Sequence, residues 1–424
     1  MQTLVHVIGG GLAGLAAAVQ LQRRGARVAL HEATDQVGGR CRSYYDRTLN
    51  ATIDSGNHLV LSGYRATLNY LRAVGASDEL VGPVEPELPF FDLATQTGWN
   101  VRPSAGYVPW WIFNRGARVP GTQPTDYLAL ASLLFAKPGR TIARSMRCDG
   151  AVWDQLLRPL LRAVMNVEPA DASAELACAL ARETFFAGGQ ACRPLVARNG
   201  LGSAFVDPAL RLLQHGGTTI RLGSRLRAMV FDDATCRVIG LAFGDVPQPT
   251  PLAGDEAVVL AVPGDVAATL VPGLLAPRQH KAIATIHFAI DPPLGFAPIT
   301  FLVNGTAERL HAHDGRLSVT VGDAARWLGQ PGEALVRATW SEVARATGLA
   351  AEPLPAWTLD VEPRATFAAL PDEELRRPGT RTRWTNLTIA GDWTATGLPA
   401  TIEGAIRSGQ QAADVLLNET MESR

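Results

Sequence analysis

The sequence has few of the residues that build disulfide frameworks or metal centres. Its 424 residues include five cysteines, and no two of them form a C-x-x-C pair. An odd and scattered set of cysteines indicates free thiols in a reducing cytoplasm rather than a disulfide framework. The eight histidines form no H-E-x-x-H arrangement, and His311 and His313, on alternate residues, indicate an exposed strand rather than a metal site. The sequence therefore implies no metal.

An excess of charge and a long apolar run are also absent. The 39 Lys and Arg residues balance 40 Asp and Glu residues, which gives a net charge of -1. The chain therefore lacks the excess of positive charge that is typical of nucleic-acid-binding proteins. The longest helical apolar stretch, residues 127–136, has ten residues, whereas a membrane-spanning helix needs about twenty. No basic segment precedes the first apolar run, which favours a core strand over a signal peptide and hence a cytoplasmic protein.

The most informative feature that is present is a glycine motif near the N-terminus. The apolar run Leu4–Ile8 leads into G-x-G-x-x-G, and a helical pattern follows. In such a motif the first glycine permits a tight turn, the second lets the backbone approach a pyrophosphate, and the third allows close helix–strand packing. The positive end of the helix then faces the phosphates. The residues predicted here to bind a dinucleotide are Gly9, Gly11, Leu12, Ala13 and Gly14.

The residues after the motif strengthen this interpretation. The helix ends near Gly25, a second strand follows over Arg27–Leu30, and Glu32 comes shortly after that strand. A carboxylate at this position accepts hydrogen bonds from ribose hydroxyls and repels a 2′-phosphate. The alternative is a glycine turn in another kind of βαβ unit.

The next stretch separates FAD from NAD as the cofactor. The sequence from Asp35 to Arg40 reads D-x-x-G-G-R and resembles the extension found in the amine oxidase and phytoene desaturase flavoprotein superfamily. Gly38 and Gly39 would let the chain pass close to the dinucleotide, and Arg40 would pair with phosphate or stand near the flavin as a fixed positive charge. The alternative is a surface turn with an incidental arginine. The resemblance implies FAD.

The C-terminal part of the chain is similar to the same superfamily. A short strand from Leu387 would deliver Gly391 and Asp392 to the ribityl and phosphate region, and a helix starting near Thr401 would point its N-terminus at the flavin ring. Segments 216–220 and 225–230 resemble the superfamily's strand beside the adenine, and segment 258–262 its strand next to the ring. The predicted cofactor-binding residues in these regions are Val230, Gly391, Asp392, Ala400, Thr401 and Ile402.

These matches predict a discontinuous α/β architecture. A Rossmann-like FAD-binding domain would comprise residues 1–85, 200–285 and 381–424, and an inserted α+β substrate domain would comprise residues 86–199 and 286–380. The 47% hydrophobic composition is sufficient for two packed domains. The proline-rich segment 246–254 is predicted to form a surface loop.

The first insertion is rich in aromatic residues. Six Phe and Trp residues fall within twenty-four residues, and leucines and then cationic residues follow. Such a composition suits a helix lying at a membrane surface, with its charges on lipid phosphates. It equally suits an apolar tunnel, or simply the core of an α/β insertion. The residues in question are Phe90, Phe91, Trp99, Trp110, Trp111, Phe113, Leu128, Leu130, Leu133, Leu134, Phe135, Lys137, Arg140, Arg144 and Arg147.

Several segments resemble a narrower family, the hydroxysqualene dehydroxylases of bacterial hopanoid pathways. They are residues 39–46, 53–58, 153–160, 183–186, 191–194 and 199–202. This resemblance implies FAD and a polyisoprenoid alcohol that is reduced to squalene. A hydrophobic substrate of this kind implies a peripheral location on the inner face of the cytoplasmic membrane. Ser55 departs from the family's pattern, in which Asn is common at this position.

The implied reaction needs a hydride from reduced flavin, an allylic cation and a proton donor for the departing oxygen. Asp54 and His58 are the candidate catalytic residues, because the superfamily's hairpin brings this loop towards the flavin. Asp54 would alternatively hold the loop through backbone N–H groups. Gly56 and Asn57, in the same loop, are predicted to contact the cofactor. The sequence does not identify the external electron donor.

Two other functions compete with this one. The first is a flavin amine oxidase or phytoene-type desaturase that runs oxidatively, and the second is a non-catalytic lipid-binding or prenyl-escort module. The aromatic insertion disfavours an amine oxidase, and the intact dinucleotide motif disfavours an escort.

Overall fold

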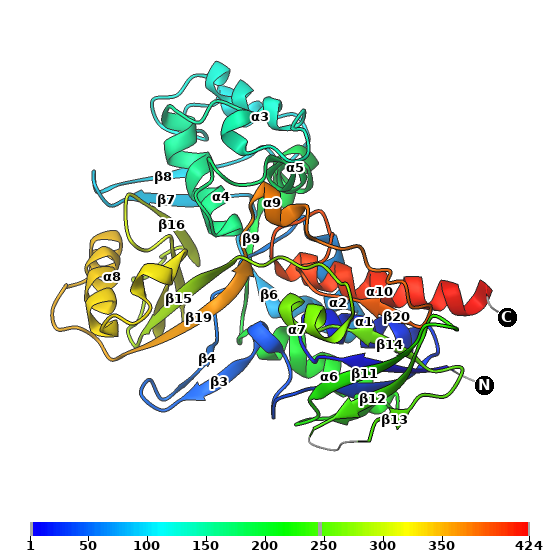
Figure 1. Cartoon of the computed structure of the whole chain (residues 1–424). Helices are drawn as coiled ribbons and strands as arrows, with labels where there is room; N and C mark the ends of the chain where they lie inside the picture. Colours follow the sequence, from blue (N-terminus) through cyan, green and yellow to red (C-terminus); the bar gives the residue numbers. More distant parts are fainter. Residues whose placement is uncertain (1–2, 245–247, 423–424) are drawn as a thin grey trace.

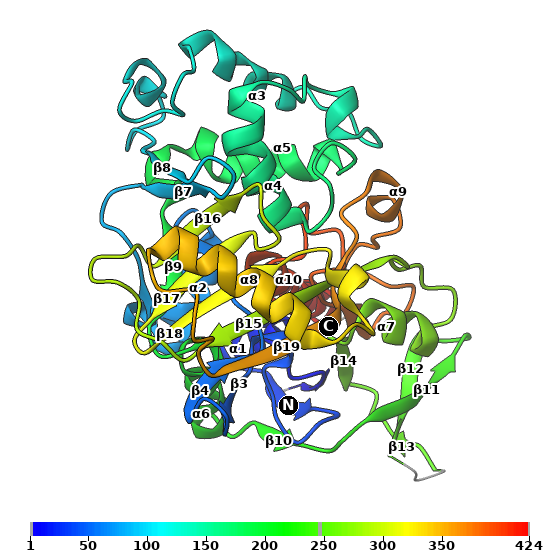
Figure 2. The same cartoon turned by 90° about the vertical axis from the view of Figure 1, so that its left-hand side faces the viewer.

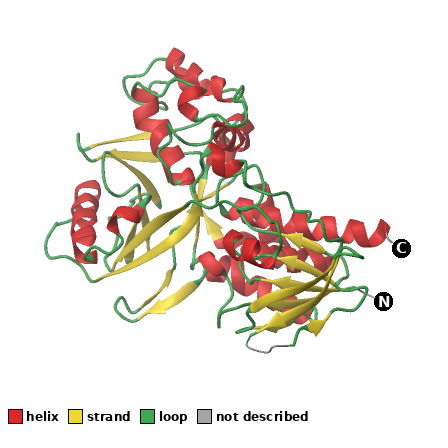
Figure 3. Ribbon diagram, in the orientation of Figure 1, coloured by secondary structure: helices red, strands yellow, loops and turns green. Residues whose placement is uncertain are grey.

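The structure is a computed structural model that describes residues 3–244 and 248–422. Figure 1 shows three bodies: a parallel sheet with its helices beside both termini, a larger sheet backed by α8 (Gly332–Thr347), and a lobe of short helices around α3 (Leu128–Leu133), α4 (Arg158–Met165) and α5 (Ala174–Glu183). The helices of this lobe gather at one end of the molecule, away from the parallel sheet (Figure 3).

A five-stranded parallel sheet has the order β10-β2-β1-β14-β20. The strands β14 and β20 are fully buried apolar runs, as expected for a parallel sheet covered on both faces, whereas the edge strand β10 is largely exposed. Both predicted helices are present, and α1 (Leu12–Arg23) packs against α10 (Ile402–Glu422). The predicted α/β, Rossmann-like fold is therefore confirmed. The strands are β1 (Leu4–Ile8), β2 (Arg27–His31), β10 (Thr219–Arg221), β14 (Ala257–Leu260) and β20 (Leu387–Ile389).

A three-stranded antiparallel sheet adjoins the parallel one. It consists of β11 (Leu226–Asp232), β12 (Arg237–Phe243) and β13 (Thr250–Pro251). Asn386, just before β20, joins the two sheets by accepting from the Val238 N–H at 2.8 Å and donating to the Val238 carbonyl at 2.9 Å. Residues 245–247, partly within the predicted 246–254 loop, lie outside the described residues. The remainder of that segment includes β13 and is thus not entirely loop.

Short elements connect the parallel sheet to the rest of the chain. β3 and β4 form a hairpin, and β9 pairs with both β5 and β6. The helices α2, α6 and α7 belong to the same region, while α9 precedes β20. Their bounds are β3 (Ser43–Asp46), β4 (Ala51–Asp54), β5 (Val60–Leu61), β6 (Leu80–Val81), β9 (Pro194–Ala197), α2 (Arg65–Val74), α6 (Asp207–His215), α7 (Gly264–Leu270) and α9 (Pro371–Glu374).

The larger sheet has seven strands in the order β19-β15-β18-β17-β16-β7-β8. Figure 2 shows α8 crossing one face of this sheet, where Leu310, Val319 and Val336 share a second hydrophobic core. The strands are β7 (Leu88–Asp92), β8 (Thr97–Val101), β15 (His280–Phe288), β16 (Ile299–Val303), β17 (Arg309–His313), β18 (Arg316–Val321) and β19 (Trp357–Phe367).

The opposite face of this sheet is also covered. His311 is only 1% exposed, so the prediction that His311 and His313 lie on an exposed strand is wrong for His311. The periodicity of a strand shows which residues share a face, but whether another part of the chain covers that face is decided by tertiary packing.

The aromatic residues of the first insertion divide into two groups. Phe90 is buried in a stack with Trp99 and Phe301, and Trp111 packs edge-on against Tyr127. Other apolar side chains of the lobe are exposed. They are Tyr107, Val108, Trp110, Phe113, Leu128 and Phe135.

All five cysteines are free thiols. Across residues 3–244 and 248–422, no helix is long and apolar enough to cross a membrane. The same ranges contain no group of three or more His, Cys, Asp or Glu side chains that could hold a metal ion.

Candidate functional site

The glycine motif forms the turn between β1 and α1. Gly9 has φ +105°, and a Cβ on it would lie 2.3 Å from the Ala261 carbonyl oxygen. A Cβ on Gly14 would lie 1.9 Å from the Gly9 oxygen. Gly11 differs, because a Cβ there would meet no atom within 4 Å. The open space at Gly11, at the start of α1 with Leu12 and Ala13, fits a dinucleotide pyrophosphate, since a helix N-terminus favours a phosphate group.

Glu32 lies just after β2, next to this turn. One carboxylate oxygen accepts from the Gly10 N–H at 2.7 Å, and the other accepts from the Thr34 N–H at 2.8 Å and the Thr34 hydroxyl at 2.9 Å. A carboxylate offers about four acceptor positions, so Glu32 retains capacity for a ribose hydroxyl. Its contacts hold it at the side of the glycine turn.

The G-G-R segment returns to the same turn. Gly38 and Gly39 have φ +108° and +56°, and the Gly38 N–H donates to the Gly10 carbonyl at 2.8 Å. A side chain with a Cβ would be strained at both glycine positions. The two glycines therefore let the chain turn beside the predicted dinucleotide site.

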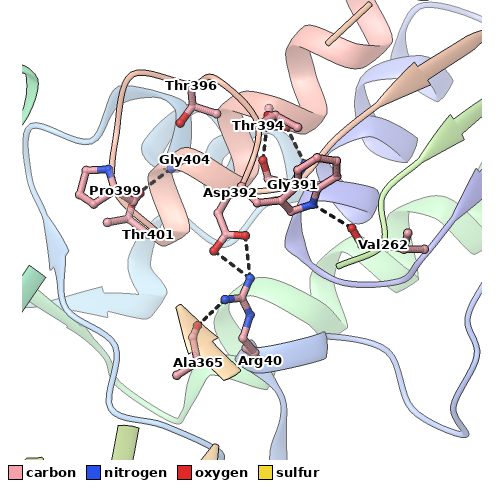
Figure 4. Close-up of polar contacts among 12 residues, drawn as sticks. Arg40, Val262, Ala365, Gly391, Asp392, Thr394, Thr396, Pro399, Thr401 and Gly404 are labelled. Carbon is pink, nitrogen blue, oxygen red and sulfur yellow. Dashed lines mark hydrogen bonds and ion pairs between the residues drawn. The ribbon is translucent and has the colours of Figure 1, made fainter. Parts of the chain in front are cut away.

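Arg40 joins the two ends of the chain. Its Nη2 donates to both carboxylate oxygens of Asp392 at 2.7 and 2.8 Å, and Nη1 donates to the Ala365 carbonyl (Figure 4). The Asp392 charge raises the pKa of Arg40. The guanidinium is thus a permanent cation whose charge is compensated by a nearly buried carboxylate.

The strand β20 ends at this ion pair. Gly391 has φ +150°, and a Cβ on it would lie 2.2 Å from Trp393 Nε1. The Gly391 N–H donates to the Ser408 hydroxyl at 2.7 Å, and Trp393 Nε1 donates to the Val262 carbonyl at 2.9 Å (Figure 4). These bonds connect the ends of β14 and β20 to α10.

The start of α10 lies beside the same residues. Ala400 and Thr401 immediately precede its first residue, Ile402. The Thr401 hydroxyl oxygen accepts from the Gly404 N–H at 3.0 Å, as an N-cap side chain does (Figure 4). Figure 4 shows Thr401 and Gly404 beside Asp392, and the orientation of this helix N-terminus towards a flavin ring stays a prediction.

The two candidate catalytic residues lie at the end of β4 and in the loop that follows it. Asp54 is buried, and its Oδ1 accepts from the Ser43 hydroxyl at 2.5 Å and the Leu201 N–H at 2.8 Å. Burial raises the pKa of Asp54, although both hydrogen bonds oppose that rise. These contacts tie the loop to segment 200–202, which is the positioning role that the sequence left open.

His58 lies further along the loop, after Gly56 and Asn57. Its Nε2 is 3.1 Å from the Arg40 carbonyl oxygen, which only accepts, so the ring bonds through an Nε2–H. Burial lowers the pKa of His58 to about 4, and the ring is therefore neutral near pH 7. The Asn57 amide donates to the Thr320 hydroxyl on β18 at 3.4 Å.

Val230 stands apart from the other predicted residues, on β11 of the antiparallel sheet. Its register partner is Gly240 on β12, and its side chain is partly exposed. The chain reaches β11 through Gly223 and Ser224, whose N–H groups donate to the carbonyls of Thr34 and Glu32 at 2.8 and 2.7 Å. The beginning of β11 thus lies beside Glu32.

The sequence interpretation missed a polar face on the seven-stranded sheet. Arg309, His311 and His287 are 6%, 1% and 0% exposed, although they come from strands outside the recognised motifs. The alternation R-L-H-A-H over residues 309–313 was the available signal, since it places three polar side chains on one face.

Comparisons with known proteins agree with this geometry. The profile of the family described as flavin containing amine oxidoreductase matches residues 12–290 and 297–417. The hydroxysqualene dehydroxylase of Sinorhizobium fredii is 48% identical, over 98% of this chain and 99% of that protein. The one of Rhodopseudomonas palustris is 46% identical over the same shares of each chain.

A solved structure supports the fold independently. An oxidoreductase from Methanosarcina mazei superimposes with a TM-score of 0.72 at 15% identity, over 97% of this chain and 100% of that one. At this identity the likeness shows a common fold alone. Together with the sequence relatives, it establishes that the chain belongs to the flavin containing amine oxidoreductases and, within them, to the hydroxysqualene dehydroxylase family of FAD-dependent oxidoreductases.

Proposed function

We propose that this protein catalyses the reductive dehydroxylation of hydroxysqualene to squalene in bacterial squalene and hopanoid biosynthesis. The observation that carries the proposal is 48% identity to a hydroxysqualene dehydroxylase over nearly the whole of both chains. Bound FAD would supply the hydride that replaces the hydroxyl group. The protein's own residues would bind the cofactor, exclude water and manage the departing oxygen.

The cofactor-binding roles belong to this proposal. The glycine turn and the N-terminus of α1 would hold the pyrophosphate, and Glu32 the ribose. The Arg40–Asp392 pair and the start of α10 would face the flavin, because they meet where β20 ends. The Val230 backbone would lie beside the adenine.

The roles of the β4 loop also belong to this proposal. Asp54 would position the loop, since its carboxylate already accepts from Ser43 and Leu201. His58 would be a weak proton donor, because its N–H bonds the Arg40 carbonyl and its ring is neutral near pH 7. We therefore assign the handling of the departing oxygen to a different part of the molecule.

The two insertions would hold the polyisoprenoid and bring it from a membrane. Trp110 and Phe113 are 67% and 63% exposed on the helical lobe, which is more apolar surface than a water-facing lobe needs. Lys137 and Arg140, which follow α3, are exposed as well. Aromatic side chains beside cations suit an anionic lipid surface, so the lobe would dock on the inner face of the cytoplasmic membrane.

An anaerobic incubation with chemically reduced FAD and hydroxysqualene tests the proposed reaction. We expect squalene by mass spectrometry, in an amount that matches the flavin oxidised. Consumption of the same substrate by oxidised flavin, with a carbonyl or more unsaturated product, would instead favour an oxidative desaturase.

A further inference from the structure

The polar face of the seven-stranded sheet results from the register in which its strands pair. In antiparallel pairs, directly opposed residues have side chains on the same face. Arg309 on β17 opposes Thr320 on β18, and His311 opposes Ser318. Ser318 in turn opposes His287 on β15, whose Nδ1 lies 2.7 Å from the Ser318 hydroxyl. Arginine, histidine and hydroxyl groups thus form two adjacent rows.

Several polar atoms of this face are buried without a hydrogen-bond partner. Among the residues that the structure describes, the Arg309 guanidinium has no hydrogen bond and no ion pair, and its Nε is inaccessible. The Nε2 atoms of His311 and His287 are also buried without a partner. The neighbouring carboxylate of Glu308 bonds Arg162 at 2.7 Å instead. Burial lowers the pKa of Arg309 and the Glu308 charge opposes that fall, but no acceptor in the described part of the chain completes the guanidinium's hydrogen bonds, and a ligand oxygen would supply one.

The same face lies against the predicted flavin site. The Asn57 amide contacts the Thr320 hydroxyl at 3.4 Å, and Thr320 is the register partner of Arg309. The loop that precedes His58 therefore lies against the row of side chains that contains Arg309, called here the Arg309 row. Burial lowers the pKa of both His58 and His311, and the Arg309 charge lowers each further. His58 in turn contacts the Arg40 carbonyl. Arg309 and His311 therefore lie within electrostatic reach of the residues that would face the flavin.

The Arg309 row changes from polar to aromatic side chains along its length. On the other side of Arg309 it continues through Phe301 on β16, Phe90 on β7 and Trp99 on β8. These three rings are stacked, with centroids 5.2 and 5.5 Å apart. An aromatic half followed by a cationic half matches an isoprenoid chain that carries one polar group.

We propose that Arg309 and His311 bind the oxygen that departs from the substrate. This inference rests on the proposed dehydroxylation. The C–O bond would break with its electron pair on oxygen, and reduced flavin, when bound, would supply the hydride for carbon and the proton that turns the departing hydroxide into water. Arg309 stabilises the negative charge that develops on the oxygen, and His311 fixes its position by a hydrogen bond. Both are catalytic residues, because they touch the reacting oxygen.

The test combines binding with single-turnover kinetics on the FAD-bound protein. Arg309→Met removes the cation at similar length, Arg309→Lys retains it, and His311→Leu removes the ring. His313→Leu, on the same strand and face, is the matched control. Binding of hydroxysqualene and of squalene is followed by the change each causes in the flavin absorbance.

We expect the variants to weaken binding of the alcohol but not binding of the hydrocarbon. Arg309→Met and His311→Leu should keep FAD and the affinity for squalene, but lose the tighter binding of hydroxysqualene. Arg309→Met should reoxidise flavin at least about 100-fold more slowly with hydroxysqualene, as when a preorganised donor is removed from a developing oxyanion. Arg309→Lys should recover part of that rate, and the control should resemble wild type.

Three results would overturn the proposal. They are a wild-type rate in Arg309→Met, an equal loss of affinity for alcohol and hydrocarbon, and loss of FAD from both Arg309 variants, which would make Arg309 a cofactor-binding residue. If wild-type protein forms no squalene, the proposed function fails separately. The comparison of alcohol with hydrocarbon binding then still decides whether this face binds a hydroxyl group.

Discussion

At the scale of single residues, Glu32 gives the most direct test of the cofactor site. Glu32→Gln should weaken FAD binding by about 1.5–3 kcal/mol, because a charge-assisted hydrogen bond to ribose becomes a neutral one. Fluorescence titration of the apoprotein with FAD measures the loss. Asp35→Asn, an exposed change of the same charge three residues later, is the control. Equal affinity in Glu32→Gln and wild type would show that Glu32 does not bind the ribose.

His287 provides a pH-dependent prediction. Burial lowers the pKa of His287 to about 3 from its usual 6.5, so the unfolded chain takes up a proton at a higher pH than the folded protein does. The corresponding stability is complete above pH 6.5 and is lost as the pH falls towards 3. The free energy of unfolding of His287→Asn should therefore decrease less than that of wild type between about pH 7 and pH 5.

Urea unfolding at a series of pH values measures this difference. Wild-type protein measured in the same buffers is the reference curve. Parallel curves for His287→Asn and wild type would show that the ring of His287 titrates normally in the folded protein.

Single residues were predictable where backbone geometry permits few alternatives. Gly9 and Gly14 occupy positions where a Cβ would collide with backbone oxygen, so their spacing alone indicates the turn. Arg309 and His311 were not predictable in this way. Their importance comes from register across three strands, and no local spacing encodes which strands pair.

At the scale of elements, the helical lobe gives a membrane prediction. Trp110→Ala and Phe113→Ala should reduce co-sedimentation with vesicles of phosphatidylcholine and phosphatidylglycerol, because both rings are exposed. Leu294→Ala, an exposed apolar change in another loop, should leave sedimentation unchanged. High salt should release the wild-type protein by screening its cationic residues.

Trp111 tests whether a tryptophan of this lobe contributes to the hydrophobic core rather than to membrane binding. It is buried against Tyr127, so Trp111→Ala should lower thermal stability rather than lipid binding. Sedimentation that is the same in the presence and absence of lipid, and unaffected by Trp110→Ala, would contradict the docking surface.

Elements were predicted well where the pattern was strong and local. The strand predicted over Leu4–Ile8 matches β1, the strand predicted over Arg27–Leu30 is one residue shorter than β2, and the helix predicted between them is α1. Around Pro159 the chain is helical throughout, because a π-helical turn at Trp153–Leu157 continues into α4. Pro159 lies in the first turn of α4, where its missing N–H is tolerated.

At the scale of the whole molecule, the predicted parallel sheet is completed by strands from both ends of the chain. Motif resemblance made β1 and β20 predictable as parts of one cofactor fold, although more than 350 residues separate them. The packing of the seven-stranded sheet against this fold left no comparable signal. The division into FAD-binding and substrate domains remains a prediction.

The proposed reaction requires that reduced flavin deliver a hydride to the carbon that loses oxygen. Flavin carrying deuterium at N5, in deuterated buffer, should convert hydroxysqualene into squalene with one deuterium at the former carbinol carbon, located by mass spectrometry and NMR. Squalene without deuterium at that carbon, or a more oxidised product accompanied by hydrogen peroxide, would contradict the account.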